Sequence, residues 1–461
     1  MKENYIDYLK ILIGFCFCLF YSSFVQAQLN SLKSDEMLKL PLKEVMKLDV
    51  QDEGDQEIVS ASKKAESIFD VPSSATVLTK EEIIKSGATS IPEALRLVPG
   101  VIVREVSNGN FDVYLRGMDN ILPYGNMTRM ISKNTLVMID NRPVYNYLNG
   151  GTFWEMLPID INDLERIEVV RGAVASLYGP NAASGVIHLI TKKKDNENVD
   201  VNANFQYGSF NSIIANTSVG YRANEKFSAI FSTNFQNRGR TDDQYFSVDS
   251  VAYVDYQGLN LSTSELAYIL PNEKTATNQF GINTFINYSP SARVSFDLRA
   301  GLQNSEGHRV FEENGTTILQ YRYSSSNYID FEANTYGIKT QVSKYSGTVK
   351  ARASTAYYDF DITDAYTEYN YEGVKNLRLS PILAYRKVIY DDSQHLEEGA
   401  NHFQFIQGKQ SIGSIGAGIK ADYQLNKKFR FIGAIRGEKY EIQDKIYLNY
   451  NFATTFKRSP P

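Results

Sequence analysis

The sequence of 461 residues carries 48 Lys and Arg against 53 Asp and Glu, which gives a formal net charge of -5. This balance offers nucleic acid no basic surface, so the composition argues against a nucleic-acid-binding protein. Aromatic residues are frequent, with 31 Tyr and 25 Phe, and their spacing along the chain indicates the fold class.

Residues 1–27 are typical of a secretory signal peptide. Two lysines flank a start that runs into the apolar stretch ILIGFCFCLFYSSFV, and a VQA tripeptide ends at Ala27. We expect cleavage after Ala27, because the apolar stretch is shorter than the ~20 residues of a membrane-spanning helix; an uncleaved anchor is the alternative. Cys16 and Cys18 both lie here, so we expect neither disulfides nor a zinc–thiolate site in the mature chain. Residues 28–56 are predicted to be a linker.

Residues 62–193 have the spacing of a small α/β domain of mixed strands. Thr79 can cap a helix, and Glu82 lies at the third position of its capping box. Ser90 can cap a second helix, in which Pro92 lies early, where its missing N–H is not needed. The strand-like segments that follow are residues 101–103, 112–118 and 134–144, and two runs within ERIEVVRGAVASLYGPNAASGVIHLITKK.

The remaining chain, residues 199–461, alternates apolar and polar residues, as strands with one apolar and one polar face do. Strands of about ten residues suit a tilted transmembrane strand, whereas strands in soluble proteins average about five or six. We therefore predict about twelve strands of a transmembrane antiparallel β-barrel, with a soluble β-sandwich as the alternative. The clearest strands are residues 199–207, 227–235, 280–288, 294–302, 336–342, 349–357, 415–423, 429–437 and 448–456.

The connections between these strands alternate in length. RANE, SPSA, YSG and LNKK are short, whereas residues 238–276 and 305–333 are long, polar and rich in Tyr. Short turns on one side and long loops on the other are typical of outer-membrane barrels. The alternation requires one more short turn, which we place at Ser380-Pro381. It also places His308, His395 and His402 in outer loops, as solvated residues without metal-ligand spacing.

Four sequence blocks occur in the order found in one family. They are SATVLTKEEIIKSGATSIPEALRLVPGVIV, VYLRGM, NTLVMIDNRPVYN and the segment ERIEVV to LITKK. Together they resemble the plug domain of TonB-dependent outer-membrane receptors, in the branch of the ferrienterochelin and colicin receptors. The resemblance implies a mainly β fold, with a barrel of roughly 22 strands closed by an N-terminal α/β plug. Because the chain ends at FKRSPP, we expect it to be a truncated receptor.

The resemblance implies transport in the outer membrane of a Gram-negative bacterium, without catalysis or a cofactor. A scarce ligand, above all an iron–siderophore complex, binds the outer side, and TonB with its inner-membrane energising complex moves the plug. Receptors for cobalamin, peptides or glycans, and a passive porin-like barrel in outer-membrane lipid, are the alternatives. The sequence has no GxxxxGK phosphate loop and no GxSxG elbow, so neither ATP-driven transport nor a hydrolase is expected.

The segment QEIVSASKK resembles the family's TonB box, an extended segment that pairs with TonB as an added strand. An ordinary first strand of the plug is the alternative interpretation. The residues of the predicted box are Glu57, Ile58, Val59, Ser60 and Ala61.

Two further groups of site residues are predicted. Arg116 and Arg171, each in an Arg-Gly turn, match family arginines that lock the plug against carboxylates of the barrel wall, and we expect Glu168 to contact the wall from the same surface of the plug. For the ligand we expect contacts from an outward segment, since its side chains can hold a polar, planar or anionic solute. These ligand residues are Tyr124, Asn126 and Arg129.

Overall fold

The computed structural model describes residues 56–117, 133–148, 150–179, 181–194, 198–247, 249–259, 273–313, 316–352, 356–395 and 406–457. The expected signal peptide, the linker up to residue 55, and Tyr124, Asn126 and Arg129 lie outside the described residues. From Glu57 onward the chain forms one unit, which holds a plug and a large sheet. No helix within the ranges given above has the length and apolar character needed to cross a membrane.

Two short helices of the plug are capped as the sequence predicts. Helix α3 (Lys80–Ser86) begins after Thr79, whose hydroxyl accepts a hydrogen bond from the Glu82 amide. The Glu82 carboxylate in turn accepts from the Thr79 amide at 2.7 Å, so the capping box is complete. Helix α4 (Ile91–Leu95) begins after Ser90, with Pro92 in its first turn. Both helices therefore begin where side chains satisfy otherwise unpaired amides.

Replacing Thr79 by alanine should weaken helix α3 by about 1 kcal/mol, since the Glu82 amide loses its acceptor. Hydrogen exchange of the helix amides should then be about fivefold faster, because 1.4 kcal/mol corresponds to a factor of ten. Lys85→Ala is the matched control, because Lys85 lies exposed in the last turn of the same helix and should leave the exchange rates unchanged. Unaltered exchange in Thr79→Ala would contradict the cap.

A five-stranded sheet forms the centre of the plug, in the order β3–β8–β9–β6–β7. Strands β6 and β9 pair in parallel and the other neighbours are antiparallel, as expected for mixed strands. Ile167, Val169, Ile187 and Leu189 are fully buried on this sheet. The bounds of the sheet strands are β3 (Ser74–Thr79), β6 (Thr135–Ile139), β7 (Arg142–Pro143), β8 (Leu164–Arg171) and β9 (Gly185–Thr191).

Smaller elements complete the plug. They are the hairpin of β1 (Glu57–Ile58) with β2 (Glu66–Ser67), the hairpin of β4 (Val101–Ser107) with β5 (Asn110–Leu115), and the short helices η2 (Trp154–Met156), η3 (Ile161–Asp163) and α5 (Ala175–Tyr178). Gly185, at the start of β9, has φ 151°, and a Cβ there would lie 2.2 Å from the Val170 carbonyl oxygen. Only glycine therefore fits where β9 approaches β8.

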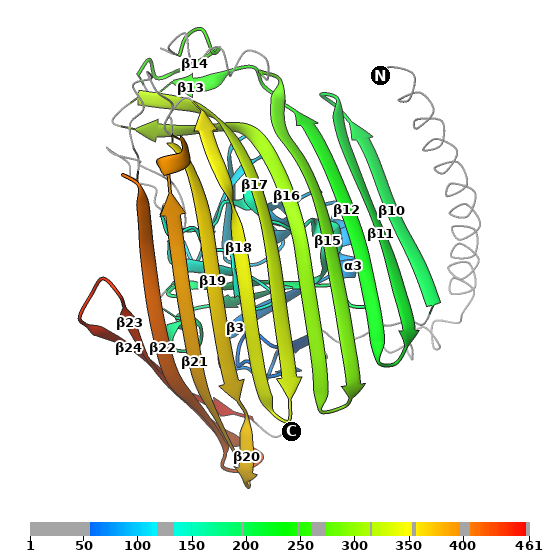
Figure 1. The fold of residues 1–461 in the computed structure, drawn as a ribbon, viewed down its shortest axis with the longest axis vertical. Helices are drawn as coiled ribbons and strands as arrows, with labels where there is room; N and C mark the ends of the chain where they lie inside the picture. Colours follow the sequence, from blue (N-terminus) through cyan, green and yellow to red (C-terminus); the bar gives the residue numbers. More distant parts are fainter. Residues whose placement is uncertain are drawn as a thin grey trace. The chain divides into compact units, whose positions relative to one another are not determined.

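The second part is a 13-stranded antiparallel sheet of described residues, whose strands pair in chain order except for β20 (Tyr371–Val374), which pairs beside them with β21 (Figure 1). A separate hairpin consists of β13 (Tyr245–Ser247) and β14 (Ala252–Val254). The other strands are β10 (Asn198–Gly208), β11 (Ser212–Asn224), β12 (Phe227–Gly239), β15 (Thr275–Ser291), β16 (Val294–Glu313), β17 (Thr316–Thr335), β18 (Ile338–Arg352), β19 (Ala356–Tyr369), β21 (Leu377–Asp391), β22 (Lys409–Gln424), β23 (Phe429–Tyr440) and β24 (Ile446–Phe456).

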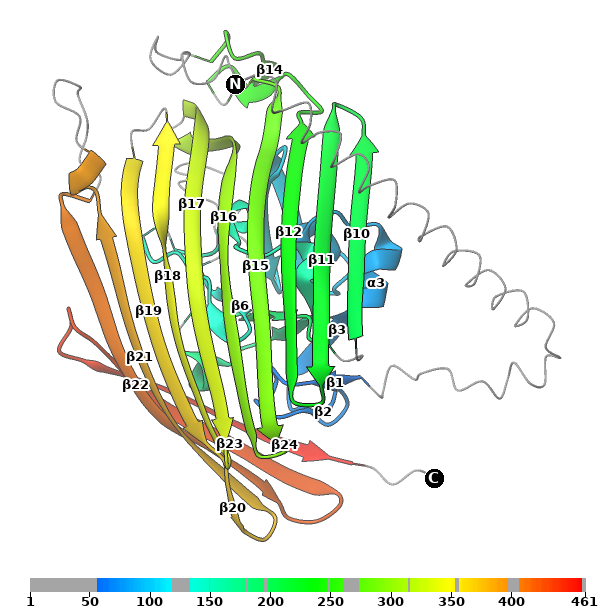
Figure 2. The same ribbon diagram turned by 45° about the vertical axis from the view of Figure 1, so that its right-hand side comes forward.

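The large sheet, called the wall below, is apolar on the outside and polar toward the plug. On β12, Phe227, Phe231 and Phe235 are exposed, whereas the intervening Ser232 and Asn234 are buried. The plug elements lie behind the strands in both ribbon views (Figures 1 and 2), on the side of these polar residues. A soluble sandwich has the opposite arrangement, so the prediction of transmembrane strands is confirmed.

The long loop predicted for residues 305–333 is wrong, because most of this segment is strand. Strands β16 and β17 are 20 residues long each and pair along their whole length. The outer half of β16, NSEGHRVFEE, is mostly polar on both faces, and this polarity was interpreted as a loop. His308 accordingly lies buried in β16, next to the Thr275 carbonyl at 2.8 Å, and not in a loop. His402 lies outside the described residues.

Two predicted short turns are also wrong. YSG (residues 345–347) lies within β18, and Ser380 and Pro381 lie within β21. The chain reverses instead at Lys375 and Asn376, where Asn376 has φ 62°. Pro381 is tolerated in the strand because it lies opposite the break between β19 and β20, beyond the residues that pair with β19. The strand that restores the alternation is β19, most of which lies in no predicted strand.

Candidate functional site

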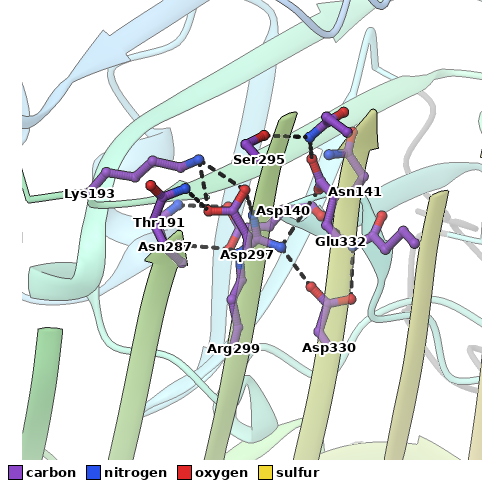
Figure 3. A network of polar contacts seen from close by, with 12 residues as sticks. Asp140, Asn141, Thr191, Lys193, Asn287, Ser295, Asp297, Arg299, Asp330 and Glu332 are labelled. Atoms are coloured by element: carbon purple, nitrogen blue, oxygen red, sulfur yellow. Dashed lines mark hydrogen bonds and ion pairs between the residues drawn. The ribbon is translucent and has the colours of Figure 1, made fainter. Parts of the chain in front are cut away.

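The plug meets the wall at a cluster of charged side chains around Arg299 of β16 (Figure 3), called the Arg299 cluster below. Arg299 is only 7% exposed and lies 2.8 Å from Asp330, 3.3 Å from Asp140, 3.6 Å from Glu332 and 3.8 Å from Asp297. Asp140 belongs to the plug, and the other three carboxylates belong to the wall. One arginine of the wall thus joins the two parts of the chain.

Asp140 is held in position by the tight turn between β6 and β7. Asp140 and Asn141 have φ 46° and 68°, a left-handed conformation that Asp and Asn tolerate better than most residues. The Asp140 carboxylate accepts hydrogen bonds from the amide and the hydroxyl of Thr191, at 3.0 and 2.7 Å. Its carbonyl oxygen accepts from the side chain of Gln341 in β18, at 2.8 Å. The turn is therefore bound by β9 and by the wall together.

A second contact of opposite polarity lies beside the first. The Lys193 ammonium, at the end of the plug, lies 3.0 and 3.2 Å from the two carboxylate oxygens of Asp297 (Figure 3). Asp297 also accepts a hydrogen bond from Asn287 of β15 at 2.8 Å. Because the Lys193 side chain is more than half exposed, this pair is weaker than a fully buried one, but its loss would leave the buried Asp297 with one cation fewer.

Other arginines of the wall also bind carboxylates of the plug. Arg430 of β23 lies 2.6 Å from Glu66 of β2 and also pairs with Asp422 of the wall at 2.6 Å. Arg322 of β17 lies 2.7 Å from Glu155 of the short helix η2. These contacts, like that of Arg299, combine a cation of the wall with an anion of the plug, which is the reverse of the predicted lock.

The arginines predicted for the lock have local partners in the plug. The Arg171 guanidinium donates to the Ser74 hydroxyl at 2.9 Å and to the Pro99 carbonyl. Partial burial and the nearby charge of Arg116 both lower the pKa of Arg171. Arg116 has φ 56° and lies exposed. A lock between these arginines and the barrel wall stays a prediction.

The predicted TonB box is seated in the plug. Ile58 is 0% exposed and pairs with Glu66 in the β1–β2 ladder, whereas Glu57 is exposed. The amides of Val59 and Ser60 both donate to one oxygen of Glu168, at 3.0 and 2.7 Å. A strand partner would therefore have to draw this segment out of the plug, and its binding to TonB stays a prediction.

Glu168 anchors this segment from β8. Its carboxylate also accepts from the Ser60 hydroxyl at 2.6 Å and from Arg166 at 2.8 Å. Burial alone would raise the pKa of Glu168, but the neighbouring His188 imidazole, the hydrogen bonds from Ser60 and the charge of Arg166 together hold the pKa below its usual value. Glu168 is therefore a charged anchor within the plug, and its proposed role at the wall stays a prediction.

The sequence interpretation missed Asp140, Glu66 and Glu155 as the plug's partners of the wall. The sequence did indicate that Arg299 faces the barrel interior, because the other face of its strand holds Phe296, Leu298 and Leu302. A cation on that face must find an anion inside the barrel. The carboxylate that pairs with Arg299 depends on how the plug lies in the barrel, which no local sequence pattern predicts.

Asp112 of β5 gives the plug a pH-dependent stability. Burial raises the pKa of Asp112 to about 7, against the opposing charge of Arg309. A raised pKa means that the folded plug binds the proton more tightly, so stability should increase as the pH falls from about 7 toward 4. Between pH 8 and 6 we expect a gain of about 1 kcal/mol relative to Asp112→Asn, from 1.36 kcal/mol per pKa unit.

The buried Trp154, the single tryptophan of this sequence, reports plug unfolding in urea through its fluorescence. The same pH dependence in Asp112→Asn would assign the effect to another group.

Comparisons with known proteins agree with this architecture. A family model described as "TonB-dependent Receptor Plug Domain" matches residues 67–186. The chain is 23% identical over 423 residues to "Vitamin B12 transporter BtuB" of Vibrio vulnificus (strain CMCP6), covering 87% of this chain and 60% of the relative. It is 32% identical over 144 residues to "Iron-regulated outer membrane virulence protein" of Vibrio cholerae serotype O1, covering 30% of this chain and 20% of the relative. The chain thus spans 60% or less of the length of these relatives.

Solved structures share the fold at low sequence identity. The siderophore receptor PirA from Pseudomonas aeruginosa matches with a TM-score of 0.57 and 15% identity, over 84% of this chain and 59% of that chain. A mutant of the ferric enterobactin receptor PfeA from Pseudomonas aeruginosa matches with a TM-score of 0.58 and 16% identity, over 87% of this chain and 61% of that chain.

The plug model, the relatives and the shared fold point to one family and one location. Strands with an apolar outer face suit the outer membrane of a Gram-negative bacterium, where the relatives of this family lie. The chain carries a plug domain of the TonB-dependent receptor type and resembles TonB-dependent outer-membrane receptors in sequence and fold.

Proposed function

We propose that this chain works as a TonB-dependent transporter that imports an iron–siderophore complex across the outer membrane. The observation that carries the proposal is the way the plug is held. It is bound to the wall by separate ion pairs, among them those of Arg299, Arg322 and Arg430, while its N-terminal segment is seated by the β1–β2 pairing and by hydrogen bonds to Glu168, His188 and Tyr178. A plug held in this way can be released by a pull on that segment.

The predicted box, residues 57–61, is the segment on which TonB would exert force. TonB would pair with it as an added strand, for which main-chain hydrogen bonds provide the affinity. Buried ion pairs suit a plug that is held firmly and then released, since their formation and their desolvation nearly balance. The energy comes from TonB and its inner-membrane complex.

A cavity between plug and wall supports a passage for the solute. Lys63, Tyr178 and Asn181 of the plug line it together with Arg386 and Arg436 of the wall. Arg386 lies over the ring of Tyr147 at 5.1 Å, and the carboxylates of Asp364, Glu368 and Glu438 line the cavity together with the cations. Such a lining favours anionic and aromatic solutes over neutral sugars.

The iron–siderophore ligand has one competitor with direct support. One relative is named as an iron-regulated outer membrane virulence protein, and others are named as vitamin B12 transporters. Cobalamin is therefore the second candidate, while peptides, glycans and a passive barrel have no relative among these. The lining holds more cationic side chains than carboxylates, which favours an iron complex that carries negative charge.

The test measures uptake in Gram-negative cells that lack their own receptors and carry this receptor, with and without TonB. We expect labelled ferric siderophore to accumulate only when TonB is present, and labelled cobalamin to stay outside. TonB-dependent uptake of cobalamin alone would overturn the choice of ligand. Uptake of either solute at the same rate without TonB would overturn the proposal of energised transport.

A further inference from the structure

One side chain connects the N-terminal segment of the plug with the turn that reaches the wall. His188 of β9 lies between Ser60, in the predicted box, and Asn141, the neighbour of Asp140 in the turn. Its Nδ1 is 2.7 Å from the Ser60 hydroxyl oxygen, and its Nε2 is 3.0 Å from the Asn141 amide nitrogen. His188 is 3% exposed, so water does not compete for either bond.

The donors and acceptors in this series of hydrogen bonds, from Asn141 through His188 and Ser60 to Glu168, are mutually consistent. The Asn141 amide can only donate, so Nε2 accepts and a neutral imidazole carries its proton on Nδ1. Nδ1 then donates to the Ser60 oxygen, and the Ser60 hydroxyl donates to Glu168 at 2.6 Å. Burial lowers the pKa of His188, against the charges of Glu168 and Asp140, while Lys339 and Arg166 also lower it. The neutral form required by the geometry is therefore the favoured one.

The bond to Asn141 fixes the peptide group that carries Asp140. The amide of Asn141 and the carbonyl of Asp140 belong to the same planar peptide unit. His188 binds this unit at its N–H, and Gln341 of the wall binds it at its oxygen. The orientation of the unit determines where the Asp140 carboxylate lies, 3.3 Å from Arg299.

We propose that His188 is a positioning residue that couples the N-terminal segment to the Arg299 cluster. When Ser60 is drawn away from Glu168, the imidazole loses the partner of its Nδ1 and ceases to hold the Asn141 amide. The Asp140–Arg299 pair then opens, so the pull on the segment and the release from the wall become one event. This inference rests on the proposed function only in taking TonB as the source of the pull.

Coupling between two sites is reciprocal, so it can be measured without TonB. A nitroxide attached to Glu57→Cys reports the mobility of the N-terminal segment, since Glu57 is exposed. The two natural cysteines lie in the predicted signal peptide, and receptor without the new cysteine gives the background. The receptor is measured in outer-membrane vesicles by electron paramagnetic resonance, at a pH where His188 is neutral.

Asp140→Asn removes the ion pair with Arg299 and suits the left-handed backbone of the turn. We expect it to raise the ratio of mobile to ordered label at least about fivefold, the lower end of typical coupling. Glu332→Gln is the matched control, because it takes a charge from the same arginine but lies in the wall. In a His188→Phe background, Asp140→Asn should have no further effect on the label.

An equal rise with and without His188 would overturn the proposal, and so would a label that does not respond to Asp140→Asn. If His188→Phe fails to fold, as judged by Trp154 fluorescence, Ser60→Ala breaks the same chain of bonds while His188 stays in place. The coupling should disappear in that background as well. Because no TonB is present, failed uptake experiments would leave this result unchanged, and the two proposals can fail separately.

Discussion

Replacing Ile58 by proline should reduce uptake of the labelled solute to the rate seen in cells without TonB. A partner that pairs as an added strand needs the main-chain N–H groups of the segment, and proline has none. Proline also fixes φ near −65°, outside the usual range of an antiparallel strand. The assay is the accumulation of labelled ferric siderophore under iron limitation, with receptor abundance in the outer membrane measured in parallel.

The matched control is Ile58→Ala, which keeps the N–H. Ile58 is fully buried, so alanine should destabilise the seated segment by about 2–5 kcal/mol. If packing alone mattered, both variants would fail to the same extent. We expect Ile58→Ala to retain TonB-dependent uptake, because a loosened segment still offers its backbone. Wild-type uptake in Ile58→Pro would mean that TonB binds elsewhere in the chain.

Replacing Arg299 by methionine should destabilise the seated plug by about 3–5 kcal/mol, the usual effect of breaking a buried ion pair. Methionine keeps much of the side-chain volume but leaves Asp140, Asp297, Asp330 and Glu332 without their shared cation. Mutual repulsion of these carboxylates adds to the loss. Urea unfolding followed by the fluorescence of Trp154 measures the effect, since this side chain is buried in the plug.

Arg293→Met provides the control for that measurement. Arg293 lies exposed in the turn just before β16, so its loss should change the unfolding free energy by no more than about 0.5 kcal/mol. If Arg299→Met and Arg293→Met had the same urea midpoint, the Arg299 cluster would not contribute to the seating of the plug.

Local features of the fold could be predicted from the sequence because their causes are local. The capping box of Thr79 depends on residues three apart, and the outward phenylalanines of β12 depend on a period of two. Strand β16 could not be predicted at full length, because its outer half, NSEGHRVFEE, lacks an alternation of apolar and polar residues. The position of Pro381 in β21 depends on where a neighbouring strand ends, which the proline itself does not reveal.

The sequence predicted charged contacts between plug and wall, but it did not predict which residues form them. Arginines in Arg-Gly turns of the plug suggested a lock with the wall, but Arg171 meets Ser74 and Pro99. The ion pairs found instead involve Asp140 and Glu66 of the plug with arginines of the wall. Either side of an interface can supply the cation of an ion pair while the other side supplies the anion. A sequence shows the charges available on each side, but their pairing depends on how the folded plug lies against the strands.

The length of β16 and β17 has a consequence for the outer side of the membrane. A tilted strand needs about 9–11 residues to cross the hydrocarbon layer, and these strands have 20 each. The remainder projects outward as paired backbone, whose conformational entropy was already lost when the protein folded. A solute that binds to these paired ends does not need to order a flexible loop on binding. Less binding free energy is then lost to ordering the protein, so more of the contact energy contributes to affinity.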